Sequence, residues 1–164
     1  MNKHKMIHKG VALLSLGILA SFSACKPQLM AKGHESDTVA KGQKAPAQFF
    51  TGEVWVKSLV NPDDTYTTST GSVYFSEKAR SNWHSHASGQ ILIVTRGKGY
   101  HQIKGQPKEV IREGDVVKCP PYVDHWHGAS EDSAMTHIYI VPNTEKGVVT
   151  WKAPVTDAEF TATE

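Results

Sequence analysis

The chain has 164 residues, of which 39% are hydrophobic and 21% charged, and this ordinary globular composition excludes a fibrous or disordered protein. Lysine and arginine number 18 against 16 acidic residues, and three of the lysines (Lys3, Lys5 and Lys9) lie among the first ten residues. Without the first 24 residues the balance is 15 basic against 16 acidic side chains, so a nucleic-acid-binding role loses its electrostatic support.

Residues 1–24 have the pattern of a secretory signal peptide: a basic start, the apolar stretch Val11 to Ala20, and small residues that lead to Cys25. Phe22-Ser23-Ala24-Cys25 resembles a bacterial lipobox, with Phe22 where that motif usually has Leu. The resemblance implies a lipid on Cys25 as the contact with a membrane, and the alternative is ordinary cleavage nearby. In both cases we expect the protein to be exported to the periplasmic or cell-surface side of a bacterial membrane.

Residues 25–46 are rich in Lys, Gly, Ser, Gln and Ala without an apolar period, which predicts a flexible tether. From residue 47 to 164 the chain alternates short β-branched and aromatic runs with Gly, Pro, Asn and Asp. The clearest expected strands are Gly71 to Phe75, Gln90 to Thr95, Gly99 to Ile103, Asp115 to Lys118 and Thr136 to Val141.

Turns are predicted at residues 61–64, 96–99, 104–107 and 112–115, each of which contains Gly, Pro, Asn or Asp. No strand is followed by a convincing amphipathic helix, so a βαβ arrangement is unsupported. No internal repeat is visible. The sequence therefore predicts one all-β domain over residues 47–164, an antiparallel sandwich or barrel.

Six of the nine histidines fall between positions 84 and 137. His84 and His86 are two residues apart, so in a strand both imidazoles project to one face. Gln90 follows after a short turn, and a second His-x-His pair, His125 and His127, follows Pro120-Pro121. Convergent N and O donors of this kind could form an octahedral metal site with positions left open.

At these residues the chain resembles the cupin superfamily, whose two motifs read G-x5-H-x-H-x3,4-E-x6-G and G-x5-P-x-G-x2-H-x3-N. Every spacing is kept, while Lys78 and Tyr122 replace turn glycines, Ala129 replaces an asparagine, and Gln90 replaces a glutamate. The resemblance implies a single double-stranded β-helix, or jelly-roll, barrel. It also implies a metal held by His84, His86, Gln90 and His125.

A three-His, one-Gln site resembles the subgroup that includes carboxymuconolactone decarboxylase-associated cupins and manganese hydroxynitrile lyases. Because Gln90 is neutral, the metal would keep its full +2 charge and act as a stronger Lewis acid. We expect one divalent transition metal, with Mn preferred and Fe, Co, Ni, Cu or Zn as competitors.

Strand alternation over residues 136–141 puts His137, Tyr139 and Val141 on one face. The lyase-type cupins have a catalytic histidine in the matching Met-Thr-His segment, so the resemblance implies that His137 is a general base. Their glutamine on the same strand corresponds to Val141, a departure that argues against cyanohydrin chemistry in particular. His127 is expected to be either a second catalytic residue or a wall of the site.

The sequence also allows expectations about the position of five other side chains. His101, in a polar hairpin segment, is expected on the surface. Trp83, Trp126 and Tyr122 either pack in the barrel or line a pocket. Cys119 is expected to be a small buried hydrophobe, and with Cys25 acylated it would have no disulfide partner.

Together these features predict a metal-binding homo-oligomer that takes a neutral or anionic small molecule. A lyase or decarboxylase-type enzyme is the first expectation, with the metal as Lewis acid and His137, aided by His127, as proton carrier. An Fe-dependent dioxygenase and a non-catalytic ligand-binding protein are the alternatives. A closed structural zinc site is disfavoured, because such sites are usually rich in cysteine.

Overall fold

A computed structural model describes residues 42–162 of the chain. The predicted signal peptide, Cys25 and the tether up to residue 41 lie outside this part, so export and lipid attachment stay predictions. Within residues 42–162 no helix is both long and apolar enough to cross a membrane.

The regular secondary structure of the described chain is almost entirely β-strand, as predicted. Its elements are β1 (Gln43–Lys44), β2 (Phe50–Thr51), β3 (Val54–Val60), β4 (Ser69–Phe75), β5 (Arg80–Ser81), β6 (His84–Ser85), β7 (Gln90–Ile103), β8 (Glu109–Arg112), β9 (Val116–Cys119), β10 (His125–Ala129), β11 (Met135–Val141), the 3-10 helix η1 (Thr144–Lys146), β12 (Thr150–Trp151) and α2 (Asp157–Thr161). β1 falls inside the predicted tether, so the sheet begins before residue 47.

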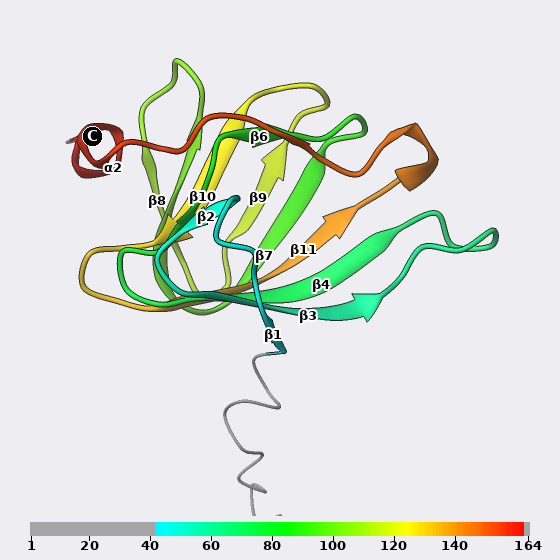
Figure 1. Cartoon of the computed structure of the whole chain (residues 1–164), viewed down its shortest axis with the longest axis horizontal. Coiled ribbons are helices and arrows are strands. Elements are labelled where there is room, and N and C mark those ends of the chain that lie inside the picture. Colours follow the sequence, from blue (N-terminus) through cyan, green and yellow to red (C-terminus); the bar gives the residue numbers. More distant parts are fainter. Residues whose placement is uncertain (1–41, 163–164) are drawn as a thin grey trace, which may run out of the picture. The chain divides into compact units, whose positions relative to one another are not determined.

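The strands form two antiparallel layers that share β7 and enclose the core (Figure 1). One layer runs β1-β3-β4-β11-β7-β9, and in the other β7 pairs with β10 and β8 while β10 also pairs with β5 and β6. The predicted all-β barrel is thus confirmed. Its main core contains Val54, Val73, Phe75, Val94, Ile111 and Met135.

The turn predicted at residues 96–99 is wrong, because β7 continues through it. Gly97 has a φ of +79°, and the pairing with β11 shifts register between Thr136 and His137. Such an irregularity bends a strand without ending it. The bend lets the first half of β7 belong to one layer and the second half to the other.

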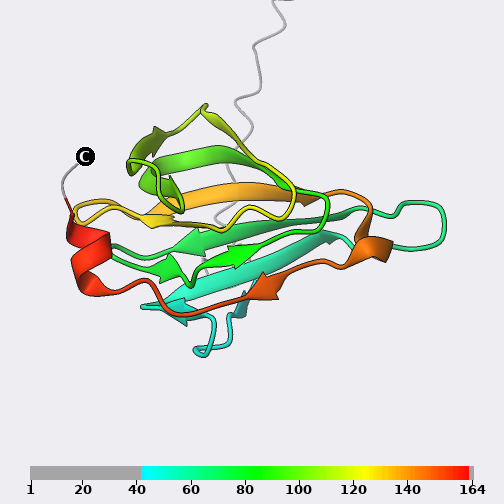
Figure 2. The same cartoon turned by 90° about the horizontal axis from the view of Figure 1, so that it is seen from above.

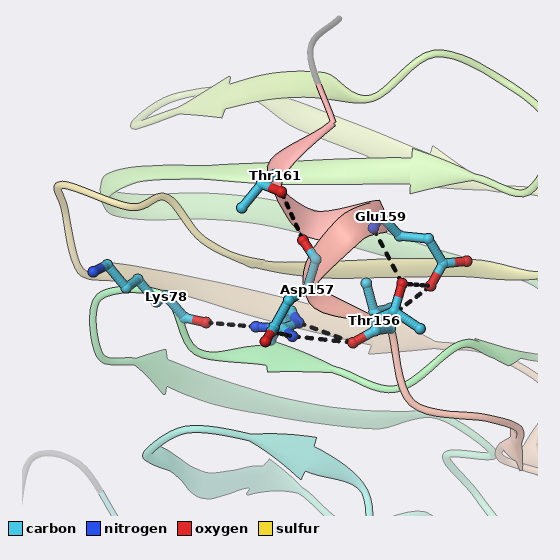
Figure 3. A network of polar contacts seen from close by, with 7 residues as sticks. Lys78, Thr156, Asp157, Glu159 and Thr161 are labelled. Carbon is cyan, nitrogen blue, oxygen red and sulfur yellow. Dashed lines mark hydrogen bonds and ion pairs between the residues drawn. The ribbon is translucent and has the colours of Figure 1, made fainter.

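The C-terminal segment runs along the barrel from η1 to α2, as the orange and red trace in Figure 2 shows. β12 pairs with β6, and α2 begins with a capping box in which Thr156 and Glu159 satisfy each other's backbone N–H groups (Figure 3). The buried guanidinium of Arg80 donates to the Val155 carbonyl and to the Asp157 carboxylate, at 3.1 and 2.6 Å from Nη2. These contacts fasten the C-terminal segment to the barrel.

Lys78 and Tyr122, which stand at glycine positions of the cupin motifs, adopt left-handed backbone conformations with φ of 64° and 61°. A side chain in this region costs roughly 1–2 kcal/mol, which glycine avoids. Lys78→Gly is therefore expected to raise the free energy of unfolding by up to about 1 kcal/mol, after the entropy that glycine adds to the unfolded chain. Urea titration measures this change. Lys78→Ala, which keeps the strain, is the control, and an equal gain in both variants would contradict strain as the cause.

Candidate metal centre and cavity

Two histidines from neighbouring strands form the centre of the candidate site. β6 pairs antiparallel with β10 in a register that sets His84 opposite His125. Directly opposed residues project to the same side of a sheet, and the two ring centroids are 4.3 Å apart. Both side chains are buried, at 2% and 0% exposure.

His86 and Gln90 complete the predicted ligand set. The His86 ring centroid lies 5.2 Å from that of His84 and 5.5 Å from that of His125. Gln90, the first residue of β7, places its Oε1 3.2 Å from His125 Nε2. Three residues that are close in sequence thus meet His125, which lies 35 residues beyond Gln90, in the barrel interior.

Backbone carbonyls determine which ring nitrogen each of the three histidines offers. Nδ1 of His84 donates to the Asn82 carbonyl at 2.9 Å, Nδ1 of His125 to the Val123 carbonyl at 3.0 Å, and Nδ1 of His86 to the Val148 carbonyl. A carbonyl can only accept, so Nδ1 carries the proton and Nε2 carries a lone pair. This is the tautomer of a metal-ligating histidine whose other nitrogen is held in place.

The donor set suits a divalent transition metal. Within residues 42–162, His86 Nε2 is buried and has no hydrogen-bond partner. Two lone pairs, on His125 Nε2 and Gln90 Oε1, face each other at 3.2 Å, an arrangement that a cation would stabilise. Burial, reinforced by the neighbouring histidines, lowers the pKa of His84 well below its ordinary value and that of His125 to about 4. Both rings are therefore neutral at pH 7, as metal binding requires.

Distance alone selects a different trio. The ring nitrogens of His84, His125 and His127 lie within 4.8 Å of one another, a group that is compatible with one metal ion and leaves His86 out. His127 differs from the other two because its Nδ1 meets a side-chain nitrogen, not a carbonyl. His86, whose Nδ1 is held by a carbonyl, therefore fits the role of a ligand better than His127.

His127 and His137 form a buried pair beside this cluster. His137 Nε2 lies 3.2 Å from His127 Nδ1, so one of the two nitrogens donates to the other. The outer nitrogens, His127 Nε2 and His137 Nδ1, are buried and meet no polar partner within residues 42–162. Burial lowers the pKa of His137 to about 4, and burial together with the neighbouring His137 holds the pKa of His127 well below its ordinary value. Both rings are neutral at pH 7.

A cavity of about 220 Å³ opens onto these side chains. His84, His86, Gln90, His127 and His137 all contribute to its lining. The predicted inward face of β11 is confirmed, since His137, Tyr139 and Val141 all line the cavity. Its other walls are mostly apolar, and include Phe49, Phe50, Val56, Val148, Val149 and Trp151.

His101 is not on the surface, so that expectation is wrong. Its side chain is 2% exposed, and its Nε2 lies 3.4 Å from the Cys119 sulfur. It is inside because β7 and β10 pair His101 with His127, which gives both residues the inward face. Cys119 is buried as expected, and burial raises the pKa of its thiol to about 12, which makes it a poor nucleophile.

The tryptophans divide between packing and the cavity. Trp83 and Trp126 pack with Val155 and Phe160 in a second core cluster, while Tyr122 is 73% exposed. The cavity is lined instead by Trp151, whose ring centroid lies 5.0 Å from that of His84. Nothing in the sequence pattern indicated Trp151 or the Val148 carbonyl, because β12 has only two residues and shows no alternation.

The lowered histidine pKa values make stability depend on pH. His125 and His137 bind protons below about pH 6.5 in the unfolded chain, but only near pH 4 in the folded one. The unfolded state binds more protons between these values, so stability is complete above about pH 6.5 and is lost as the pH falls towards 4. The loss is about 3 kcal/mol for each histidine in metal-free protein.

Urea titrations of chelator-treated protein near pH 7 and pH 5 measure the greater part of this loss, about 2 kcal/mol for each histidine. His137→Phe, which cannot titrate, should show a smaller difference between the two. A stability that stays constant over this range would contradict neutral buried histidines.

Comparison with known proteins gives concordant matches. A model of the Cupin domain matches residues 60–141. The chain is 42% identical over 117 residues to an (R)-mandelonitrile lyase from Granulicella tundricola, which spans 71% of this chain and 89% of the lyase. It is 47% identical to a cupin-like protein of known crystal structure from Thermotoga maritima, with a TM-score of 0.71 over 73% of this chain and 91% of that one. A DMSP lyase from Ruegeria pomeroyi, 16% identical with a TM-score of 0.55 over 71% of this chain and 59% of its own, shares the fold.

Proposed function

Because this chain belongs to the cupin family, we propose that it is a metal-dependent lyase that cleaves a small hydroxyl-bearing molecule to a carbonyl compound. The observation that carries the proposal is the pair of neutral histidines, His127 and His137, which lines the same cavity as the carbonyl-anchored His84 and His86. A ligand-binding protein has no need of a proton acceptor at that place.

His84, His86, Gln90 and His125 are the proposed ligands of one divalent transition metal. The carboxamide oxygen of Gln90 suits manganese, the preferred ion, and the three imidazoles also suit Fe, Ni, Cu and Zn. When bound, the metal supplies Lewis acidity towards the substrate oxygen. Gln90 contributes an uncharged oxygen, so the ligand set does not offset that acidity. The Asn82, Val123 and Val148 carbonyls keep each imidazole in its binding tautomer.

The histidine pair would move the proton. With the shared proton on His127 Nδ1, His127 Nε2 is bare and His137 Nδ1 carries a proton. His127 then accepts the substrate's hydroxyl proton at Nε2 while its Nδ1 proton passes to His137. The bond between the hydroxyl carbon and the leaving fragment breaks, its electron pair leaves with the fragment, and the His137 Nδ1 proton neutralises it. The products are a carbonyl compound and a protonated leaving group.

The cavity supports a substrate of about the size of a single ring with small substituents. An engineered apolar cavity of about 150 Å³ holds benzene, so 220 Å³ leaves room for a few more atoms. Mostly apolar walls favour a neutral substrate over an ionised one. The relative described as a mandelonitrile lyase suggests the first probe, and because Val141 replaces the glutamine of the lyase-type cupins, other 2-hydroxy compounds are needed beside it.

The test is turnover of mandelonitrile to benzaldehyde and hydrogen cyanide by manganese-loaded protein, followed by a panel of other small 2-hydroxy compounds. We expect metal-dependent product with at least one of them, and His137→Ala as the control without turnover. Binding without turnover across the panel would favour a non-catalytic ligand-binding protein. Export, the lipid on Cys25 and homo-oligomer formation remain separate proposals, which fractionation and sedimentation test.

A further inference from the structure

Tyr139 is a polar side chain in the cavity that the proposed mechanism does not use. It lies on β11 two residues beyond His137 and lines the same cavity. The side chain is half-buried, and none of the hydrogen bonds found within residues 42–162 involves its hydroxyl. A tyrosine hydroxyl at the wall of a largely apolar cavity offers a hydrogen-bond donor that a ligand can use in place of water.

The position of the Tyr139 ring depends on the absence of a side chain at Gly71. β4 pairs with β11 so that Gly71 lies directly opposite Tyr139. A Cβ atom on Gly71 would lie 2.6 Å from Cε1, 2.8 Å from Cζ and 2.7 Å from the hydroxyl oxygen of Tyr139. The ring tip therefore occupies the space that any larger residue at position 71 would fill, and the backbone of β4 supports the hydroxyl.

The position of the hydroxyl separates it from the candidate metal centre. The tip of the ring reaches β4, whereas Gln90 lies on β7, the neighbour of β11 on its other side. A spacing of about 3.4 Å per residue puts the Tyr139 backbone roughly 7 Å from that of His137. The polar residues of the cavity lining are thus the histidine and glutamine cluster and Tyr139, and its other residues are apolar.

We propose that Tyr139 is a substrate-binding residue whose hydroxyl donates a hydrogen bond to an acceptor on the part of the substrate remote from the reacting carbon. The substrate class is then a small apolar ring or chain with the reacting hydroxyl or carbonyl at one end and a second acceptor oxygen at the other. A few well-placed polar groups in an apolar pocket orient a ligand in this way. This inference depends on the proposed function in one respect only, namely in identifying the end of the substrate that reacts.

Two pairs of carbonyl probes of equal shape test the hydrogen bond: 4-methoxybenzaldehyde against 4-ethylbenzaldehyde, and the corresponding 3-substituted pair. Within each pair an ether oxygen replaces a methylene group, so only the acceptor differs. Calorimetry on metal-loaded protein should give a Kd about 3- to 10-fold lower for the methoxy member of one pair, the range expected for one neutral hydrogen bond. Tyr139→Phe should abolish that preference and leave the Kd of the ethyl member unchanged.

Tyr66→Phe, a tyrosine that is 66% exposed and lies outside the cavity lining, is the matched control and should keep the preference. Gly71→Ala should weaken both members of a pair, and in a Tyr139→Ala background it should have little effect, since no ring remains to be displaced. A preference that survives in Tyr139→Phe, or its absence from the wild-type protein in both pairs, would overturn the inference. Because Kd is measured without turnover, a preserved preference in a protein that cleaves nothing would count against the lyase proposal alone.

Discussion

Purified His84→Ala and His125→Ala proteins are expected to contain almost no metal after dialysis, whereas the wild-type protein retains close to one equivalent. Changes to residues that only orient metal ligands typically lower affinity about 10- to 100-fold, so loss of a ligand itself should cost more. Elemental analysis measures the content, and a competition titration with a chelator measures the affinity. The control is His101→Ala, which removes another buried histidine of the same barrel from outside the proposed ligand set.

Alanine variants of His86 and His127 show which three histidines hold the metal. If the carbonyl-anchored rings are the ligands, His86→Ala loses the metal and His127→Ala keeps it. The opposite result would favour the trio selected by distance, His84, His125 and His127. Metal retained in all four alanine variants would refute a metal centre at this place.

His137→Ala is expected to keep the metal and to lose about 10²- to 10⁴-fold in kcat on any substrate that the wild-type protein turns over. His137 is 0% exposed and its pKa is about 4, so at pH 7 it is a neutral ring able to accept or pass on a proton. Its side-chain hydrogen bond is with His127, so no proposed metal ligand depends on it directly. Metal content and rate are measured on the same preparation.

Replacing both histidines tests whether His127 and His137 act as one unit. If His127 and His137 carry one proton as a unit, either single change breaks the relay, and His127→Ala/His137→Ala should be about as slow as the slower single variant. Losses that multiply would mean that the two rings act independently. Full activity in His137→Ala with full metal would remove His137 from the mechanism.

Much of the site could be predicted because its residues are local in the sequence. His84 and His86, or His125 and His127, are two apart, and the strand period alone puts each pair on one face. The turn at position 78 could be predicted in the same way. Lys78 stands at a glycine position of the first motif, and its φ of 64° shows that the left-handed turn forms there although the residue is not glycine. All-β architecture followed in the same way from short alternating runs without helical periodicity.

Tertiary structure decided what depends on contacts between segments far apart in the chain. The sequence placed His101 on the surface because its neighbours are polar, but its pairing with His127 turned it inward. The tautomer of His86 depends on a carbonyl 62 residues away, at Val148, and Trp151 reaches the cavity because β12 pairs with β6. The place of Tyr139 depends on the register that sets it opposite Gly71. Local periodicity determines which way a side chain points within its own strand, whereas only the pairing of strands determines what it meets there.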